Sequence, residues 1–254
     1  MESLDARDAW PPLLRPGVLA GFGAYDAWEA RVLLDWLVPA TEARLTAGDA
    51  LSAAVCWSEG IRGWRPQHGA LPVLIAQRFS SPRRPATVAD PDAALETLGA
   101  LVSALSKAVP LPWRPTAWPD GLTDAALGGR ALTRREGDAA IARYLGVRLA
   151  GSWLAYQGKG VRSVMASVVS AYALTCAALA ATKSSVVTVG HLTSAIRAAD
   201  WLQLHLLDRD AWADWCAASE EESDAGSLLK LVACGAHVMD RCSWATPSPP
   251  YPFP

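Results

Sequence analysis

The sequence predicts an all-α protein, an irregular bundle of about eight helices packed around a central helix of small residues at 161–182. Apolar residues recur at helical spacing through most of the 254 residues. Helix-start signals stand at Asp90-Pro91-Asp92 and at Thr133-Arg-Arg-Glu136, and the second matches a capping box. Twenty uncharged residues separate Arg162 from Lys183, which is typical of a helix buried on all sides.

The N-terminal half is expected to hold three helices. The first covers 25–38, where apolar residues stand four positions apart, and the second covers 42–57. Glycines and prolines then interrupt the pattern, and the apolar run 71–79 fits a strand or a helix equally well. The third helix follows the first of the two start signals and covers 91–109.

The C-terminal half shows a clearer helical pattern. The capping box begins a helix that runs to about Gln157, and Gly158 and Gly160 then break or kink the chain before the central helix. Further helices are expected at 191–207, 209–218 and 225–242.

The chain is interpreted as a single helical domain, 1–254, with one point at which it could divide. Residues 110–121 contain four prolines and two tryptophans, a composition typical of a linker. This linker would join subdomains 1–109 and 122–246. The tail 247–254 is rich in proline, which excludes a helix and favours an extended polyproline conformation.

Cysteine usage and the N-terminus favour a cytoplasmic protein. The five cysteines form no Cys-x-x-Cys pair, and the acidic start of the chain lacks the apolar stretch of a secretory signal. The uncharged segment 163–182 is long enough to span a membrane, but alanine, serine and threonine dominate it and contribute little to insertion. We therefore expect a buried core helix and no membrane association.

The net charge of −2 conceals an uneven distribution along the chain. Residues 1–60 carry a net charge of −5, residues 61–162 one of +7 and residues 163–254 one of −4. The positive charge of the middle third comes almost entirely from arginine, whose planar guanidinium matches phosphate and carboxylate groups. Three interpretations stay open: compensation by the acidic flanks inside the fold, a protein partner, or a nucleic acid.

Tryptophan and arginine side chains between the expected helices are the candidate partner-binding residues. They are Trp64, Trp113, Trp118, Arg62, Arg65, Arg83, Arg84 and Arg114. Trp244 is another loop tryptophan, expected to dock either against its own domain or against a partner. A protein partner fits this composition best, with a nucleic acid as the alternative.

One helix face combines groups that could carry chemistry. Spacings of four, four and three residues place these four side chains on one side of a helix: Arg197, Trp201, His205 and Asp208. His205 and Asp208 could form a general base with its orienting carboxylate, and Arg197 could bind an anion. The same spacing also fits an ordinary solvated face with a local ion pair.

Two further clusters carry ligand-binding groups. Lys159 and Arg162 flank the expected start of the central helix, where they could hold an anion; the alternative is a simple kink. Cys234, His237 and Cys242 could bind a metal, but helical rotation turns His237 away from the apolar face that holds Cys242. We therefore expect no metal site, and no cofactor is expected.

These observations favour a non-enzymatic helical interaction or scaffold subunit of a larger cytoplasmic assembly, with contact to nucleic acid through the basic middle third left open. The alternative is a helical-bundle enzyme or small-molecule-binding protein with its site on the face that contains His205. A deep apolar pocket facing His205 would favour the enzyme. Exposed tryptophans around a solid core would favour the docking protein.

Overall fold

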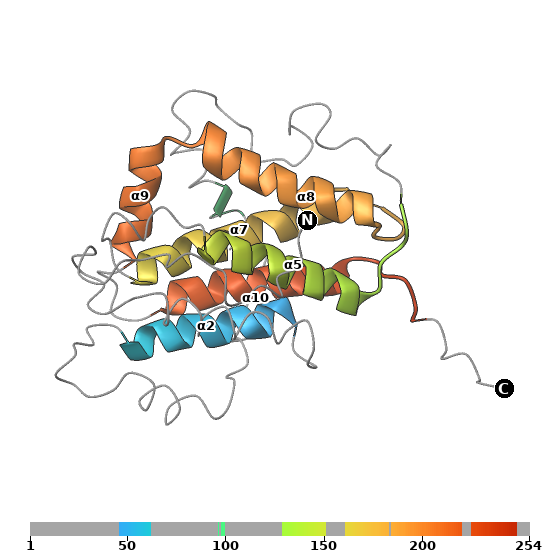
Figure 1. Ribbon diagram of the computed structural model, residues 1–254, viewed down its shortest axis with the longest axis horizontal. Coiled ribbons are helices and arrows are strands. Elements are labelled where there is room, and N and C mark those ends of the chain that lie inside the picture. The colour runs from blue at the N-terminus through green and yellow to red at the C-terminus, as the bar shows by residue number, and fades with distance from the viewer. Residues whose placement is uncertain are drawn as a thin grey trace, which may run out of the picture.

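A computed structural model describes residues 46–61, 96, 98–99, 129–150, 161–182, 184–219 and 225–247 of the chain (Figure 1). Within these ranges the protein is all-α, as the sequence predicts. Its β-type pairing there is an isolated bridge between Ala131 and Thr188. The predicted segments 25–38, 71–79 and 110–121 lie outside the described residues, as do the predicted helix end and glycine break at 151–160 and the predicted tail 247–254 apart from Pro247.

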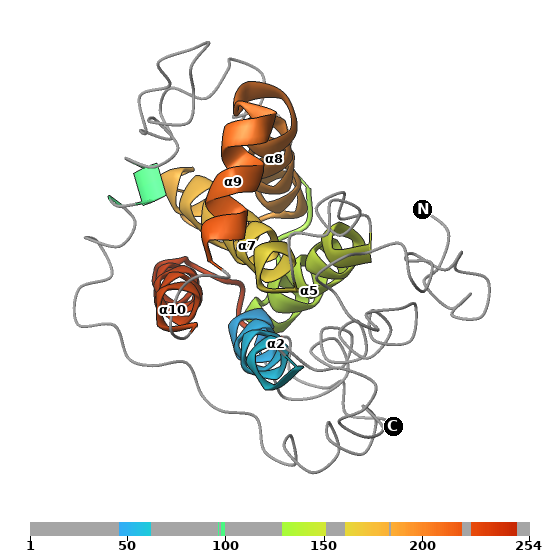
Figure 2. The ribbon, with the colours of Figure 1, turned by 90° about the vertical axis from the view of Figure 1, so that its left-hand side faces the viewer.

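Helix α7 lies at the centre of the described helices. In chain order these are α2 (Ala47–Ile61), α5 (Arg134–Ala150), α7 (Val161–Ala181), α8 (Val189–Trp201), the π-helical turn η4 (Leu202–Leu206), α9 (Arg209–Ala218) and α10 (Gly226–Arg241). Helix α7 contacts α2, α5, α8, α9 and α10, and every residue from 162 to 179 is buried. Figure 2 shows the other helices arranged around it. Within the predicted helix 91–109, the three described residues are helical.

The composition of α7 suits this central position. Its small side chains let neighbouring helices approach closely, and its buried hydroxyl groups bond to the preceding turn. Ser170 Oγ donates to the carbonyl oxygen of Ala166 at 2.7 Å, and Thr175 Oγ1 donates to that of Ala171 at 2.8 Å. By length and composition, Arg162–Ala181 is the one stretch among the described helices that could cross a membrane, and most of it is buried inside the protein. Packing against the other helices accounts for its apolar character.

The side chain of Tyr172 is fully buried where α7 meets α2 and α10. A Cβ atom at Gly235 of α10 would lie 2.4 Å from Tyr172 Cε1, and one at Gly48 of α2 would lie 3.0 Å from the Tyr172 hydroxyl oxygen. Two glycines therefore make room for one large side chain between three helices. Burial raises the pKa of Tyr172 well above its ordinary value, so the hydroxyl group stays protonated.

Threonine caps begin α5 and α8. The predicted capping box is present at α5: Thr133 N donates to Glu136 Oε2 at 2.8 Å, and Glu136 N donates to Thr133 Oγ1 at 3.3 Å. At α8, His191 N donates to Thr188 Oγ1 at 3.2 Å, and Thr188 N donates to His191 Nδ1 at 3.3 Å. These bonds satisfy amides that a helix start leaves without an internal partner.

Helix α2 starts and ends later than the predicted helix 42–57. Thr46 lies outside the helix and caps it, since Asp49 N donates to Thr46 Oγ1 at 3.1 Å and Thr46 N donates to Asp49 Oδ2 at 3.3 Å. The helix therefore begins at Ala47 and continues to Ile61. The predicted start was wrong because it followed apolar periodicity and missed the capping pattern Thr46-x-x-Asp49 in the sequence.

The predicted helix 191–207 combines two helix types. It begins earlier, as α8, and continues as η4, in which Leu207 N donates to Leu202 O at 3.1 Å. A π-helical turn holds an extra residue. The side chains of Leu204 and His205 are therefore rotated away from the positions that a continuous α-helix would give them.

Three extended segments from distant parts of the sequence meet at one end of the helices, a feature that the sequence did not predict. They are 130–132 before α5, 187–188 before α8 and 243–245 after α10. The amide of Leu132 donates to Val187 O and that of Val187 donates to Ser243 O, both at 2.8 Å, and the amide of Ala245 donates back to Leu132 O at 2.9 Å. We call this arrangement the clasp; it lies at the right-hand end of Figure 1. Helices α5 and α8 both begin there.

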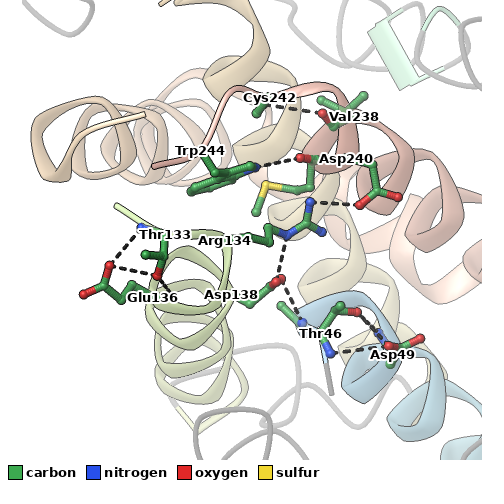
Figure 3. Close-up of polar contacts among 12 residues, drawn as sticks. Thr46, Asp49, Thr133, Arg134, Glu136, Asp138, Val238, Asp240, Cys242 and Trp244 are labelled. Atoms are coloured by element: carbon green, nitrogen blue, oxygen red, sulfur yellow. Dashed lines mark hydrogen bonds and ion pairs between the residues drawn. The ribbon is translucent and has the colours of Figure 1, made fainter. Parts of the chain in front are cut away.

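A buried aspartate beside the clasp links three helices (Figure 3). Asp138 of α5 accepts from Ala47 N at the start of α2 at 3.1 Å and from Arg134 Nε at 2.8 Å. Arg134 Nη1 in turn donates to Asp240 Oδ1 near the end of α10 at 2.9 Å. Burial alone would lower the pKa of Arg134, but the two aspartates outweigh it and raise that pKa.

Trp244 covers the same network. Its indole Nε1 donates to Met239 O at 2.9 Å, and the guanidinium carbon of Arg134 lies 5.7 Å from the centre of its ring system. A Cβ atom at Gly137 would lie 2.4 Å from the indole. Of the two alternatives for Trp244, docking against its own domain is the one observed.

Candidate interaction surface

The structure does not place the eight loop residues predicted to bind a partner. Trp64, Trp113, Trp118, Arg62, Arg65, Arg83, Arg84 and Arg114 all lie outside the described residues. A candidate surface is therefore built from the side chains of the described helices.

The predicted anion-binding pair is described at one residue only, since Lys159 lies outside the described residues. Arg162 is fully buried in α7, and its Nε and Nη2 atoms each donate to the carboxylate of Glu59 at 2.6 Å. Its Nη1 atom donates to the carbonyl oxygen of Ser219 at 2.6 Å. The anion that meets this guanidinium is thus a side chain of α2.

Three arginines of the basic middle third pair with residues of the acidic flanks. The pairs are Arg162 with Glu59, Arg134 with Asp240 and Arg148 with Asp200. Compensation inside the fold, one of the three open interpretations, therefore accounts for these charges. In the same third of the chain, the side chains of Arg135 and Arg143 are exposed.

Helix α5 meets α8 and the following turn η4 along a polar seam, which we define as Tyr144, Arg148, Asp200 and Gln203. Tyr144 Oη donates to Asp200 Oδ1 at 2.7 Å, and Arg148 Nη1 lies 3.4 Å from the same oxygen. Arg148 also donates to Gln203 Oε1, and Gln203 Nε2 donates to Ser167 O of α7 at 3.4 Å. Burial raises the pKa of Tyr144, and the nearby Asp200 carboxylate adds to this, so the hydroxyl group remains a donor.

Three exposed apolar side chains flank the seam, and we call them the apolar rim. They are Val147 in α5, Trp201 in α8 and Leu204 in η4, with 54%, 41% and 50% of their surface exposed. Each is the chain neighbour of a seam residue, so the three lie around one contact between two helices. Among the described residues, one other large apolar side chain is comparably exposed, Val189 at the clasp.

The residues proposed for catalysis lie beside the rim. The ring of His205, which is exposed, lies 4.7 Å from that of Trp201 and is tilted by 40° to it. Asp208 Oδ1 accepts from Ala211 N at 2.8 Å and so caps α9. Arg197 is exposed one helical turn before Trp201. The Asp208 carboxylate therefore stabilises a helix start, while the His205 imidazole lies against an indole.

The cysteines and the histidine of α10 take separate positions. Cys234 is buried, His237 is exposed and Cys242 is half-buried at the end of the helix. The part of the chain that the structure describes contains no group of three or more potential metal ligands.

Sequence reasoning did not find the seam or two of the three rim residues. Tyr144 meets its partner on another helix, and the outward position of Leu204 depends on a π-helical turn that periodicity does not reveal. One signal was present: Val147 is an apolar residue on the polar face of its helix, one turn after Arg143.

The chain matches no family model, and neither the curated proteins nor the solved structures include a significant match to it. The functional argument therefore rests on the geometry of the described helices.

Proposed function

We propose that this chain is a non-enzymatic interaction or scaffold subunit of a cytoplasmic assembly and that a protein partner docks on the apolar rim. The observation that carries the proposal is the gathering of Val147, Trp201 and Leu204 around one seam. Exposed apolar side chains that cluster on a folded protein are typical of a binding surface.

The rim has the composition of an energetic centre in a protein interface. Burying one apolar side chain of this size fully is worth about 1.5–3 kcal/mol, and tryptophan is among the residues that most often dominate binding. Three such side chains, each already partly covered, provide several kcal/mol in total when a partner covers them. The seam between them is held by its own hydrogen bonds and needs no partner to satisfy it.

The proposal keeps the wider expectations from the sequence as hypotheses. These are a bundle of about eight helices around 161–182, further docking through the loop tryptophans and arginines, and contact to nucleic acid through the basic middle third. Catalysis around His205 stays the alternative hypothesis, in which one oxygen of the Asp208 carboxylate caps α9.

Site-specific photo-crosslinking in cells tests the proposal. A photoreactive amino acid replaces Leu204 in one variant and, as a matched control, Lys230 in another; Lys230 is an exposed residue of α10. We expect a partner that is captured from position 204 and not from position 230. That partner is then identified, purified and titrated against the full chain.

A double variant decides whether the rim carries the binding. In Val147→Ser/Leu204→Ser, affinity for the purified partner should fall by about 100-fold, while Lys230→Ser should leave it unchanged. Unchanged melting temperatures would show that the fold is intact, as expected for exposed positions. Equal capture from both positions, or full affinity of the double variant, would refute docking at the rim.

A further inference from the structure

Two arginines stand at equivalent positions beside the rim. Arg143 lies one helical turn before Val147 on α5, and Arg197 lies one turn before Trp201 on α8. Both side chains are exposed, and neither has an ion pair within the described residues. We call them the basic pair.

The two arginines of the basic pair lie at matching positions along α5 and α8. Both helices begin at the clasp, and their contacts run in the same order, Tyr144 with Asp200 and then Arg148 with Gln203. They therefore run side by side in the same direction, and the basic pair lies on the clasp side of the rim. Asp200, the acidic residue of the seam, already accepts from Tyr144 and pairs with Arg148.

We propose, building on the proposed function, that the rim binds an acidic amphipathic helix of a partner protein. Apolar residues spaced three or four apart on that helix would cover the rim, and Asp or Glu about one turn further along would meet the basic pair. Two parallel helices with a seam between them offer a third helix a surface on which its ridge of side chains packs.

The chemistry of the surface favours a protein helix over a nucleic acid. Two of the three rim residues, Val147 and Leu204, are aliphatic and offer no ring on which a base stacks. A strand would need an exposed sheet edge, and the described residues offer only the isolated bridge of the clasp.

A displayed peptide library tests the charge and the helix together. Its members have apolar residues at helical spacing, while the flanking positions vary among Glu, Lys, Gln and Ser. They are selected on the full chain and, in parallel, on Arg143→Glu/Arg197→Glu. We expect the wild-type chain to enrich Glu over Lys, and the charge-reversed variant to enrich Lys over Glu.

The best acidic peptide is then measured against both proteins by fluorescence anisotropy. We expect its affinity to fall about tenfold or more on the charge-reversed variant and to return when Lys replaces its Glu residues. Arg135→Glu is the matched control, an exposed arginine of α5 near the clasp, and should change affinity less than twofold. Enrichment without a charge preference, or no enrichment, would overturn the proposal.

A labelled single-stranded oligothymidylate is the competing probe. Binding that depends on Arg143 and Arg197 and that displaces the peptide would favour a nucleic acid instead. A failure of the acidic-helix proposal can be told apart from a failure of the proposed function. If only the acidic helix is wrong, crosslinking at position 204 still captures a protein partner.

Discussion

The indole of Trp244 occupies the space in which a side chain at position 137 would lie. A Cβ atom built on Gly137 would stand 2.4 Å from Trp244 Cζ3, well inside van der Waals contact. Gly137 lies in the first turn of α5 and Trp244 follows α10, so this contact joins two segments far apart in the sequence. Glycine inside a helix costs about 1 kcal/mol relative to alanine, and here the packing of Trp244 requires it.

Gly137→Ala should therefore destabilise the protein, although alanine is the better helix former. We expect the free energy of unfolding to fall by about 1–3 kcal/mol, because an extra methyl group in a packed contact displaces the indole. In a Trp244→Ala background the same change should stabilise by up to about 1 kcal/mol. Urea unfolding of the unchanged chain, the two single variants and the double variant measures both effects. Stabilisation by Gly137→Ala in the otherwise unchanged chain would contradict the contact.

Removing one partner of the ion pair between the buried Arg162 and the partly exposed Glu59 should cost more than removing both. Arg162→Met leaves the Glu59 carboxylate without its bidentate partner and should lower stability by about 3–5 kcal/mol. Adding Glu59→Leu to that variant should recover at least about 1 kcal/mol. Chemical unfolding of the two single variants and the double variant gives the coupling energy between the residues. If the two single losses of stability simply add in the double variant, a close ion pair is contradicted.

Glu136 should contribute to the acid sensitivity of the fold. Hydrogen bonds from the Thr133 amide, from Arg130 and from the Thr133 hydroxyl lower the pKa of Glu136 from 4.5 to about 2. Because the folded-state pKa lies below the unfolded-state value, its stabilisation is complete above about pH 4.5 and is lost as the pH falls towards 2.

Glu136→Gln should weaken the dependence of stability on pH between about 4.5 and 2. At neutral pH the loss should stay below about 1 kcal/mol, since the carboxylate is partly exposed and water screens it. Melting temperatures across this range measure the slope, and Gln at this position retains the capping oxygen. A slope equal to that of the unchanged chain would show that the capping box has no role in acid unfolding.

The buried cysteines should resist thiol reagents in the folded protein. Burial raises the pKa of Cys176 and Cys216, which leaves little thiolate, and Cys234 is buried as well. Cys56 and Cys242 are partly exposed and should react first. Absorbance titration with an aromatic disulfide at pH 8 should show fast labelling of two of the five thiols at most, and of all five after denaturation.

Local signals in the sequence predicted the class of fold and the start of α5. The apolar, uncharged run predicted the buried helix α7, and Thr133 with Glu136 marked the start of α5. The start of α2 was misplaced because Thr46 and Asp49 form a cap that periodicity does not indicate. The clasp could not be predicted, since its bonds join backbone groups whose side chains leave no pattern.

The candidate surface was predicted only in part, for a related reason. Trp201 was singled out on its helix, but its role as an exposed neighbour of the seam depends on α5, whose Tyr144 and Arg148 reach across to α8. A contact between side chains far apart in sequence has no local signature. The predicted arrangement of His205 and Asp208 followed α-helical spacing, whereas the chain passes through the π-helical turn η4 before Asp208 caps α9.

The clasp also bears on the order in which the chain is made. The amides of Val187 and Ala245 find their partners in the clasp, and one of those partners, Ser243, is synthesised after every described helix. Until residues 243–245 have left the ribosome, the starts of α5 and α8 lack the third segment that joins them. Closing so long a loop is slow relative to forming helices. A nascent chain of this protein therefore completes this end of its fold only after residue 245 has emerged from the ribosome.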